Sequence, residues 1–296
     1  MVGDKPGRPR LVFGGRELDL SRPLVMGVVN VTPDSFSDGG RNFDPGIAVA
    51  NALRLVQEGA DLLDVGGEST RPGSEPVLAA EELRRVLPVI EALASRVAVP
   101  ISIDTTKAEV AARAAAAGAT IANDVSGLRF EPELADVARE RGMALVLMHS
   151  RGRPKDMQRA PSYEDTVGEV VGELGEALER ASARGVPREA TIVDPGIGFA
   201  KRPGDNLVLL GAIPRLRAAL ARPVLVGPSR KAFLGVVTGA PVDRRGPGTL
   251  AAVAVAVYCG AEMVRVHDVA EARQAADVAA AIRDGRPAGG PRCLSC

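Results

Sequence analysis

The sequence is poor in the residues that metal sites and disulfide-bonded folds require. Its 296 residues include no tryptophan, two tyrosines, two histidines and three cysteines. A zinc site needs three or four ligands at defined spacing, so a zinc enzyme is not expected. The odd number of cysteines argues against a disulfide framework. Cys293 and Cys296 form a terminal C-x-x-C in a Gly- and Pro-rich tail, where we expect no helix N-terminus to lower a thiol pKa.

The chain also lacks an excess of charge of one sign and a long apolar run. Lys plus Arg number 37 and Asp plus Glu number 37. A protein that binds nucleic acid usually carries a basic excess or stripe, and neither is present. The longest apolar stretch, residues 250–259, is much shorter than the roughly 20 residues that cross a bilayer. The N-terminal segment is polar, without an apolar signal region. We therefore expect a cytoplasmic protein that has neither nucleic acid nor membrane as a partner.

What the chain has instead is a repeating pattern of short β-branched runs and longer stretches with helical spacing. Continuous apolar runs are typical of strands that are buried on both faces. Several of the helical stretches end in glycine, which commonly terminates a helix. The strand-like runs lie at residues 24–30, 61–67, 100–104, 120–124, 143–149, 191–195, 223–227 and 262–266.

Eight β-then-α units in about 260 residues predict the α/β class and a (β/α)₈ TIM barrel. A doubly wound open sheet is the alternative, but no G-x-G-x-x-G follows the first run. Residues 11–20 predict a short N-terminal β-hairpin that turns at Gly14-Gly15 and closes the bottom of the barrel. We expect a single domain over residues 1–285 and a flexible tail over residues 286–296.

Almost every predicted strand ends on a polar residue. The C-terminal ends of the strands form the active-site rim of this fold, so these side chains should meet there. A single Asp or Asn after a strand is more often a helix N-cap, but eight such ends on one rim favour a functional site. The residues are Asn30, Asp64, Glu68, Thr70, Arg71, Asp104, Asn123, Asp124, His149, Asp194, Ser229, Arg230, Lys231, Arg265, His267 and Asp268.

One group on this rim is basic and comes from the second, seventh and eighth units: Arg71, Arg230, Lys231, Arg265 and His267. Loops after strands 7 and 8 commonly bind phosphate in this fold. Because the whole chain carries no net charge, a local cationic cluster favours a small anionic ligand over a polymer. The alternative is that Arg230 and Arg265 pair with neighbouring acids.

A second group, Asp104, Asn123 and Asp194, comes from the third, fourth and sixth strands. An ionised Asp accepts two parallel N–H bonds, so this group suits a flat, nitrogen-rich heterocycle. A glycosidase carboxylate pair is the alternative, but sugar sites usually have aromatic platforms, which this chain lacks. The loops at 31–44 and 66–76 are long for βα connections, and we expect them to act as lids over the site.

Several segments, taken together, resemble the dihydropteroate synthase family in order and approximate spacing. The resemblance extends from about Leu11 to about Arg283. The segments are MGVVNVTPDSFSDGG (26–40), DVGGESTRPG (64–73), IDTTK (103–107), NDVSG (123–127), LMHSRGRPKDMQ (147–158), DPGIGFAK (194–201), SRKAFLG (229–235) and RVHDV (265–269).

The resemblance implies condensation of 6-hydroxymethyl-7,8-dihydropterin diphosphate with 4-aminobenzoate, which gives 7,8-dihydropteroate and diphosphate in folate synthesis. It implies a homodimer, a target of sulfonamides, and a Mg²⁺ ion contacted by Asn30. The implied catalytic residues are Asp104, Lys231, Arg71 and Asp38, the last two on mobile loops. The implied pterin diphosphate site comprises Thr70, Arg71, Asp104, Asn123, Asp194, Lys231, Arg265 and His267. The implied aminobenzoate site comprises Phe36, Pro72, Phe199 and Lys231.

The chemistry of the residues agrees with this reaction. A diphosphate on a CH₂ next to an electron-rich pterin can leave first, and positive groups and Mg²⁺ stabilise the departing charge. The attacking aniline nitrogen is neutral at pH 7, so no strong base is required. Ala232 departs from the family pattern, in which Ser is common and its hydroxyl helps to hold the aminobenzoate carboxylate. Two alternatives are a pterin-binding methyltransferase with a corrinoid partner, which needs no diphosphate site, and a non-catalytic pterin-binding homologue.

Overall fold

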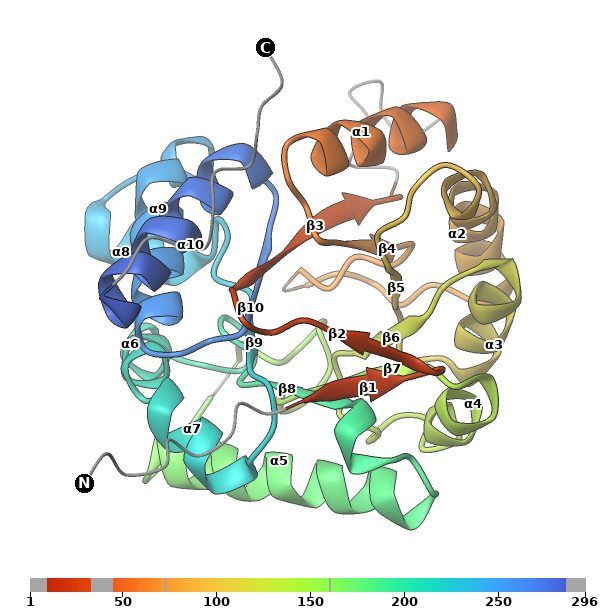
Figure 1. Ribbon diagram of the computed structural model, residues 1–296. Helices are drawn as coiled ribbons and strands as arrows, with labels where there is room; N and C mark the ends of the chain where they lie inside the picture. Colours follow the sequence, from red (N-terminus) through yellow and green to blue (C-terminus); the bar gives the residue numbers. More distant parts are fainter. Residues whose placement is uncertain (1–9, 33–44, 72, 160, 286–296) are drawn as a thin grey trace, which may run out of the picture.

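The computed structural model describes residues 10–32, 45–71, 73–159 and 161–285, and its centre is a barrel of parallel strands (Figure 1). The strand order is β8-β7-β6-β5-β4-β3-β10-β9, and a parallel bridge between Val193 and Val224 joins the two ends of this order. The predicted (β/α)₈ barrel is therefore confirmed. The strands are β3 (Leu24–Asn30), β4 (Leu62–Gly66), β5 (Ile101–Asp104), β6 (Ile121–Asp124), β7 (Ala144–Met148), β8 (Thr191–Asp194), β9 (Leu225–Val226) and β10 (Met263–Val266).

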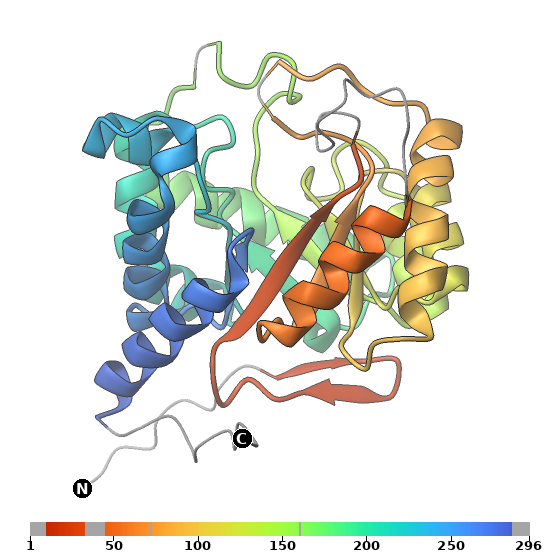
Figure 2. The same cartoon turned by 90° about the horizontal axis from the view of Figure 1, so that it is seen from above.

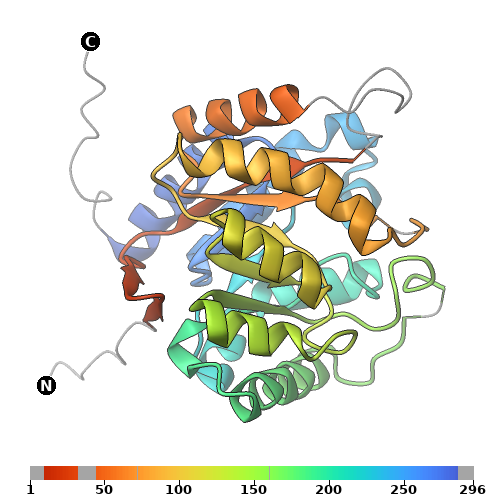
Figure 3. The same cartoon turned by 90° about the vertical axis from the view of Figure 1, so that its right-hand side faces the viewer.

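The helices surround this barrel, as Figures 1 and 3 show. Their buried faces pack on the strands, while α9 and α10 also pack on each other. No helix in the described ranges is long and apolar enough to cross a membrane. The helices are α1 (Pro45–Gln57), α2 (Ala79–Ala94), α3 (Ala108–Ala117), α4 (Leu134–Arg141), α5 (Thr166–Ala183), α6 (Pro203–Gly211), α7 (Ile213–Leu220), α8 (Ala232–Thr238), α9 (Gly246–Tyr258) and α10 (Val269–Asp284).

The strands are buried on both faces, as their continuous apolar runs predict. Every residue of β4 to β9 is buried, and the two half-buried strand residues are Asn30 of β3 and Arg265 of β10. Both of these residues lie at or near the C-terminal end of their strand. The polar side chains of Asp64, Asp104 and Asp194 are buried among these strands, where a charge without a partner is costly.

The N-terminal hairpin is also as predicted. Strand β1 (Leu11–Phe13) pairs antiparallel with β2 (Arg16–Leu18). Gly14 and Gly15 form the turn with φ of 52° and 72°, the left-handed region that suits glycine. A Cβ on Gly14 would lie 2.9 Å from the carbonyl oxygen of Gly142, which lies just before β7, the fifth strand of the barrel. The hairpin therefore packs against the N-terminal end of the barrel, opposite the predicted rim (Figure 2).

Candidate active site

Side chains from many strand ends line one small cavity at the C-terminal end of the barrel. The barrel thus brings together most of the residues that the sequence assigned to a heterocycle and its anionic group. No His or Cys is among them. The lining residues are Thr70, Asp104, Asn123, Val125, Met148, Asp194, Ile197, Phe199, Gly227, Lys231 and Arg265.

Arg265 organises the carboxylates on one side of this cavity. Its Nε donates to Asp64 Oδ2 at 2.6 Å, and its Nη2 donates to Asp104 Oδ2 at 2.7 Å. Asn123 Nδ2 donates to the same Asp64 oxygen at 3.0 Å. The other oxygens of Asp64 and Asp104 are buried and have no hydrogen-bond partner among the described residues. The sequence places Asp64 among the polar residues of the rim but in neither the heterocycle group nor the basic group, and the structure shows that it is the common partner of Arg265 and Asn123.

Burial controls the protonation of the two aspartates that line the cavity. It raises the pKa of Asp104 to about 7, while the Arg265 guanidinium lowers this pKa and the Asp64 carboxylate raises it. Burial also raises the pKa of Asp194 to about 6, against the lowering effect of the Gly196 N–H, which donates to Asp194 Oδ1 at 2.7 Å. Both carboxylates are therefore short of donors, which a ligand with N–H groups would supply.

Lys231 and Phe199 form the opposite wall. Lys231 directly precedes α8, and its Nζ lies 4.1 Å from the centroid of the Phe199 ring, a cation–π contact. A Cβ on Gly198, whose φ is 82°, would lie 2.8 Å from Lys231 Cδ, so glycine permits this close approach. Burial lowers the pKa of Lys231 to about 8, while Asp194 and Asp104 raise it. The ammonium stays charged at pH 7 between an apolar ring and two carboxylates.

The remaining basic residues of the rim pair with neighbouring side chains. Arg230 forms a salt bridge with Asp268 at 2.6 Å, and Arg265 binds Asp64 and Asp104 as described above. This is the acid-paired arrangement that the sequence left open. His267 Nδ1 lies 2.9 Å from Ser229 Oγ. Burial, together with the nearby Arg265, lowers the pKa of His267 to about 4, so this ring is neutral at pH 7.

The other residues predicted for the site lie on or near the loops above it. Asn30 ends β3 and is half-buried. Thr70 lines the cavity and Arg71 is exposed beside it on the loop after β4. Phe36, Asp38 and Pro72 lie outside the described residues.

His149 lies behind the cavity and does not line it. Lys201 Nζ donates to His149 Nδ1 at 2.9 Å, and His149 Nε2 lies 3.1 Å from Glu173 Oε2, outside hydrogen-bonding alignment. Burial lowers the pKa of His149 to about 4 and that of Lys201 to about 7. Gly196 has a φ of 68°, and a Cβ there would lie 1.8 Å from the His149 carbonyl oxygen. This network therefore supports the turn that follows Asp194.

Comparison with known proteins identifies the family. The family model described as pterin binding enzyme matches residues 26–267. The chain belongs to this family. Its sequence is 47% identical to the dihydropteroate synthase of Synechocystis, over 88% of this chain and 90% of the relative. It is 44% identical to the dihydropteroate synthase of Escherichia coli K12, over 90% of this chain and 94% of the relative.

Solved structures of the same enzyme share the barrel. The dihydropteroate synthase of Xanthomonas albilineans, solved with 4-aminobenzoic acid, has a TM-score of 0.87 and 47% identity, with 96% of this chain and 100% of that chain covered. The Yersinia pestis enzyme, solved in a complex with a sulfonamide drug, also has a TM-score of 0.87, with 42% identity and coverage of 94% and 100%. The resemblance seen in the sequence motifs is therefore confirmed over most of the chain.

Proposed function

We propose that this chain is a dihydropteroate synthase, a transferase that joins 6-hydroxymethyl-7,8-dihydropterin diphosphate to 4-aminobenzoate and releases diphosphate. The observation that carries the proposal is the cavity in which Asp104, Asn123 and Asp194 face Lys231. It offers buried acceptors for the N–H groups of a pterin and a cation for an anionic leaving group. Relatives that are 44% to 47% identical over most of their length carry the name of this enzyme.

The aspartates bind and activate the pterin in this proposal. A pterin presents N–H donors along one edge, and an ionised carboxylate accepts two of them in parallel. Asp104 Oδ1 is a buried acceptor without a partner among the described residues, so it is available to such an edge. The negative charge near the ring also stabilises the cation that develops at the CH₂ carbon when its bond to the diphosphate oxygen breaks.

Cationic side chains stabilise the departing diphosphate. Lys231 and Arg265 line the cavity, and Arg71 lies at its rim on the loop after β4. The neutral ring of His267 contributes hydrogen bonds and not charge. The aniline nitrogen then attacks the CH₂ carbon with its lone pair, and it loses a proton after the new C–N bond forms. The Phe199 ring gives the aminobenzoate an apolar wall next to Lys231.

Asn30 suits the Mg²⁺ ion that this reaction implies. Mg²⁺ keeps several water ligands and typically takes one or two protein oxygens together with substrate phosphates. Asn30 offers one carboxamide oxygen at a half-buried strand end, and no cluster of three or more His, Cys, Asp or Glu that suits a metal occurs in the described part of the chain. The residues therefore fit an ion that arrives with the diphosphate. Bound there, Mg²⁺ would neutralise charge on the leaving group.

An assay of diphosphate release with the two substrates tests this proposal. The purified chain should release diphosphate only when both substrates and Mg²⁺ are present, and chelation of Mg²⁺ should stop the release. A pterin-binding methyltransferase would bind the pterin and release no diphosphate. A non-catalytic homologue would bind both substrates without turnover. Either result would contradict the proposed reaction.

We also propose a homodimer that forms through α9 and α10. A groove of about 590 Å³ lies between these helices, and it is lined mainly by apolar side chains such as Leu250, Ala254 and Ala275. Exposed large apolar residues on the same helices include Val278 at 59% and Ile282 at 66% exposure. An apolar surface of this kind on two packed helices suits a second copy of the same surface in a two-fold dimer.

A further inference from the structure

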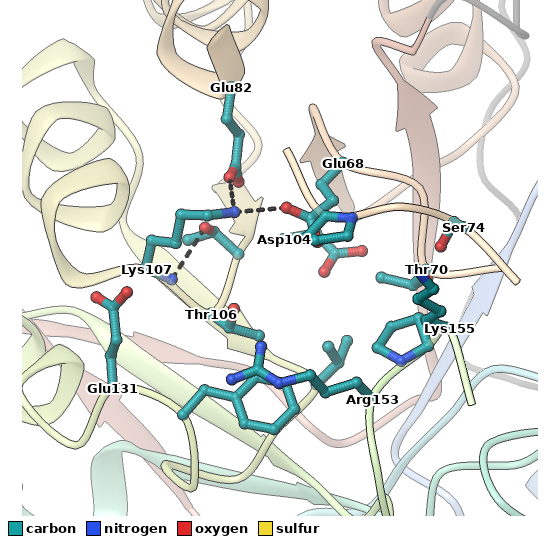
Figure 4. Close-up of a pocket in the computed structure, with 15 residues that line it drawn as sticks. Glu68, Thr70, Ser74, Glu82, Asp104, Thr106, Lys107, Glu131, Arg153 and Lys155 are labelled. Carbon is teal, nitrogen blue, oxygen red and sulfur yellow. Dashed lines mark hydrogen bonds and ion pairs between the residues drawn. The ribbon is translucent and has the colours of Figure 1, made fainter. Parts of the chain in front are cut away.

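A second cavity, of about 190 Å³, adjoins the pterin site and contains a buried cluster of charges (Figure 4). Both cavities are lined by Thr70, Asp104 and Val125. Lys107 lines one side of the second cavity, and its Nζ lies between the carboxylates of Glu68 and Glu82, as Figure 4 shows. Neither the proposed reaction nor the binding of its substrates uses Lys107 directly. Of the IDTTK segment (103–107), the proposed function therefore gives a role to Asp104 and none to Lys107.

Lys107 joins three elements of the barrel through its ammonium group. It directly precedes α3, and its Nζ donates to Glu68 Oε2 at 2.5 Å and to Glu82 Oε2 at 2.6 Å. Glu68 begins the loop after β4, two residues before Thr70, and its Oε2 also accepts the N–H of Val77 at 3.2 Å. The Glu68 carboxylate thus links the beginning and the end of the loop that carries Thr70 and Arg71.

Glu82 makes this arrangement dependent on Lys107. Its side chain on α2 has no exposed surface, and its Oε1 has no hydrogen-bond partner among the described residues. Burial raises the pKa of Glu82, while Lys107 lowers it. A buried charge that loses its only cationic partner is strongly destabilised. Without the ammonium of Lys107, the carboxylates of Glu68 and Glu82 would lie next to each other with no cation between them. Glu68 would then be displaced, because it lies on a loop whereas Glu82 is buried on α2.

The same two carboxylates act on the pterin site through space. Glu82 and Glu68 both raise the pKa of Asp104, which must stay ionised to accept the pterin N–H groups. The ammonium of Lys107 offsets their charge at close range. The other charged groups that act on Asp104 from the packed elements are Arg265, Asp64 and Lys231.

We propose that Lys107 is a positioning residue for the pterin diphosphate site: it holds Glu68, and with it the loop that carries Thr70 and Arg71, while it offsets the charge of Glu68 and Glu82 beside Asp104. This inference rests on the proposed function, because it assigns Lys107 to the binding of that substrate. Lys107 touches neither substrate in this proposal. Its effect should therefore be larger on the pterin diphosphate, which Thr70, Arg71 and Asp104 contact in this proposal, than on 4-aminobenzoate, which Phe199 and Lys231 also hold from the barrel.

The test compares K107M with K107R, with the double variant K107M/E82Q and with the control K155M. Lys155 is matched because it also pairs with a carboxylate of the same loop, Glu75 at 2.8 Å, but this pair is exposed and contributes little. K107M should raise the KM for the pterin diphosphate at least about tenfold and raise the KM for 4-aminobenzoate by a clearly smaller factor. K155M should match the wild type in both, and K107R should keep most of the activity because it keeps the charge.

The double variant separates a positioning role from a purely structural one. E82Q removes the charge that opposes Glu68 and supplies an amide donor to it, so K107M/E82Q should recover at least about threefold of the lost pterin affinity. Calorimetric titration with the pterin diphosphate in the absence of 4-aminobenzoate reports this affinity without turnover. A failure of the proposed reaction in the wild type is therefore recognised separately. Unchanged pterin affinity in a folded K107M would overturn the proposal. An equal loss for both substrates without recovery in the double variant would overturn it as well.

Discussion

At the scale of single residues, the described barrel places ionisable groups where an apolar core would be more stable. Asp64, Asp104 and Asp194 are at most 6% exposed. Taking a carboxylate out of water costs several kcal/mol unless partners compensate. Arg265 compensates Asp64 and Asp104 directly, whereas Asp194 has the N–H of Gly196 and the more distant ammonium groups of Lys231 and Lys201. The site therefore has hydrogen-bond acceptors without donors. A ligand that donates to them forms hydrogen bonds that are stronger than the same bonds in water.

Lys231→Ala should remove most of the turnover. The ammonium lies between the wall formed by Phe199 and the aspartates, where a charge-assisted hydrogen bond contributes roughly 1.5–3 kcal/mol. We expect a fall in kcat/KM of about 10- to 100-fold, and more if both substrates depend on this group. Steady-state kinetics on the folded variant provide the measurement, and thermal unfolding provides the control. Kinetics close to those of the wild type would remove Lys231 from the site.

Asp194 should make pterin binding sensitive to acid. The ionised carboxylate accepts N–H groups, and burial places its pKa at about 6 in the free protein. As the pH falls through this value the group takes up a proton and becomes a donor, so affinity should decrease by up to about tenfold per pH unit. Burial raises the pKa of Asp104 to about 7, so protonation of Asp104 adds to this decrease, and affinity should become constant only above about pH 8.

The variant Asp194→Asn tests whether Asp194 causes this decrease of pterin affinity at low pH. The amide keeps the shape but places N–H donors against the N–H groups of the pterin, a mismatch that costs about 1–3 kcal/mol. Pterin affinity at pH 8 should fall more than aminobenzoate affinity, and the acid dependence should become shallower. Calorimetric titration of a pterin from pH 5 to pH 8 measures both. An unchanged affinity would reduce Asp194 to an acceptor for the Gly196 N–H.

At the scale of elements, local patterns predict the barrel well because its strands are buried on both faces and most of its helices bury one apolar face. The patterns do not predict the lengths and boundaries of elements that depend on tertiary packing. The run at 223–227 forms only the two-residue strand β9, and α6 and α7 are two helices between consecutive strands. The apolar stretch at 250–259 has no polar face from which its orientation can be predicted. In the structure Val253 and Val257 of α9 are buried, whereas Val255 and Tyr258 are exposed.

The exposed face of α9 and α10 leads to a prediction about assembly. A charge at Ile282, which lines the groove, would be buried without a partner in a dimer. The wild type should sediment as a dimer, and Ile282→Glu should shift it toward the monomer. Val236→Glu is the matched control, because Val236 of α8 is as exposed, at 68%, and does not line the groove. A monomeric wild type, or a dimeric Ile282→Glu variant, would show that this face is not the interface.

At the scale of the whole molecule, the fold explains why so much of the site is readable from the sequence. A parallel barrel brings the ends of all its strands to one rim, so polar residues at strand ends meet whatever their separation along the chain. Which of these side chains form ion pairs with one another cannot be predicted from the positions of the strand ends. Arg265 on β10 binds Asp64 on β4 and Asp104 on β5, and Lys107 binds Glu68 and Glu82, because the packing of side chains from separate strands, loops and helices decides which atoms meet.

The order in which ligands bind should also be a property of the assembled rim. The family resemblance assigns the aminobenzoate pocket to Phe199 and Lys231 on the barrel and to Phe36 and Pro72 on two loops, although the two loop residues lie outside the described part of the chain. The loop sequences at 31–44 and 66–76 have few apolar side chains to bury, and ordering a residue costs roughly 1–2 kcal/mol.

Bound diphosphate with Mg²⁺ can offset that cost, because it gives Arg71 an anion and Asn30 a metal ion next to those loops. We therefore expect a sulfonamide to bind the free protein weakly and to bind at least about tenfold more tightly once diphosphate and Mg²⁺ are both present, a coupling of roughly 1.4 kcal/mol. Titration of a sulfonamide with neither, either and both of these ligands measures the coupling. Linkage requires that the sulfonamide tighten diphosphate binding by the same factor, which is an internal check. Equal sulfonamide affinities in all four titrations would mean that Phe199 and Lys231 form a complete pocket on the rigid barrel, and neither loop would then act as a lid.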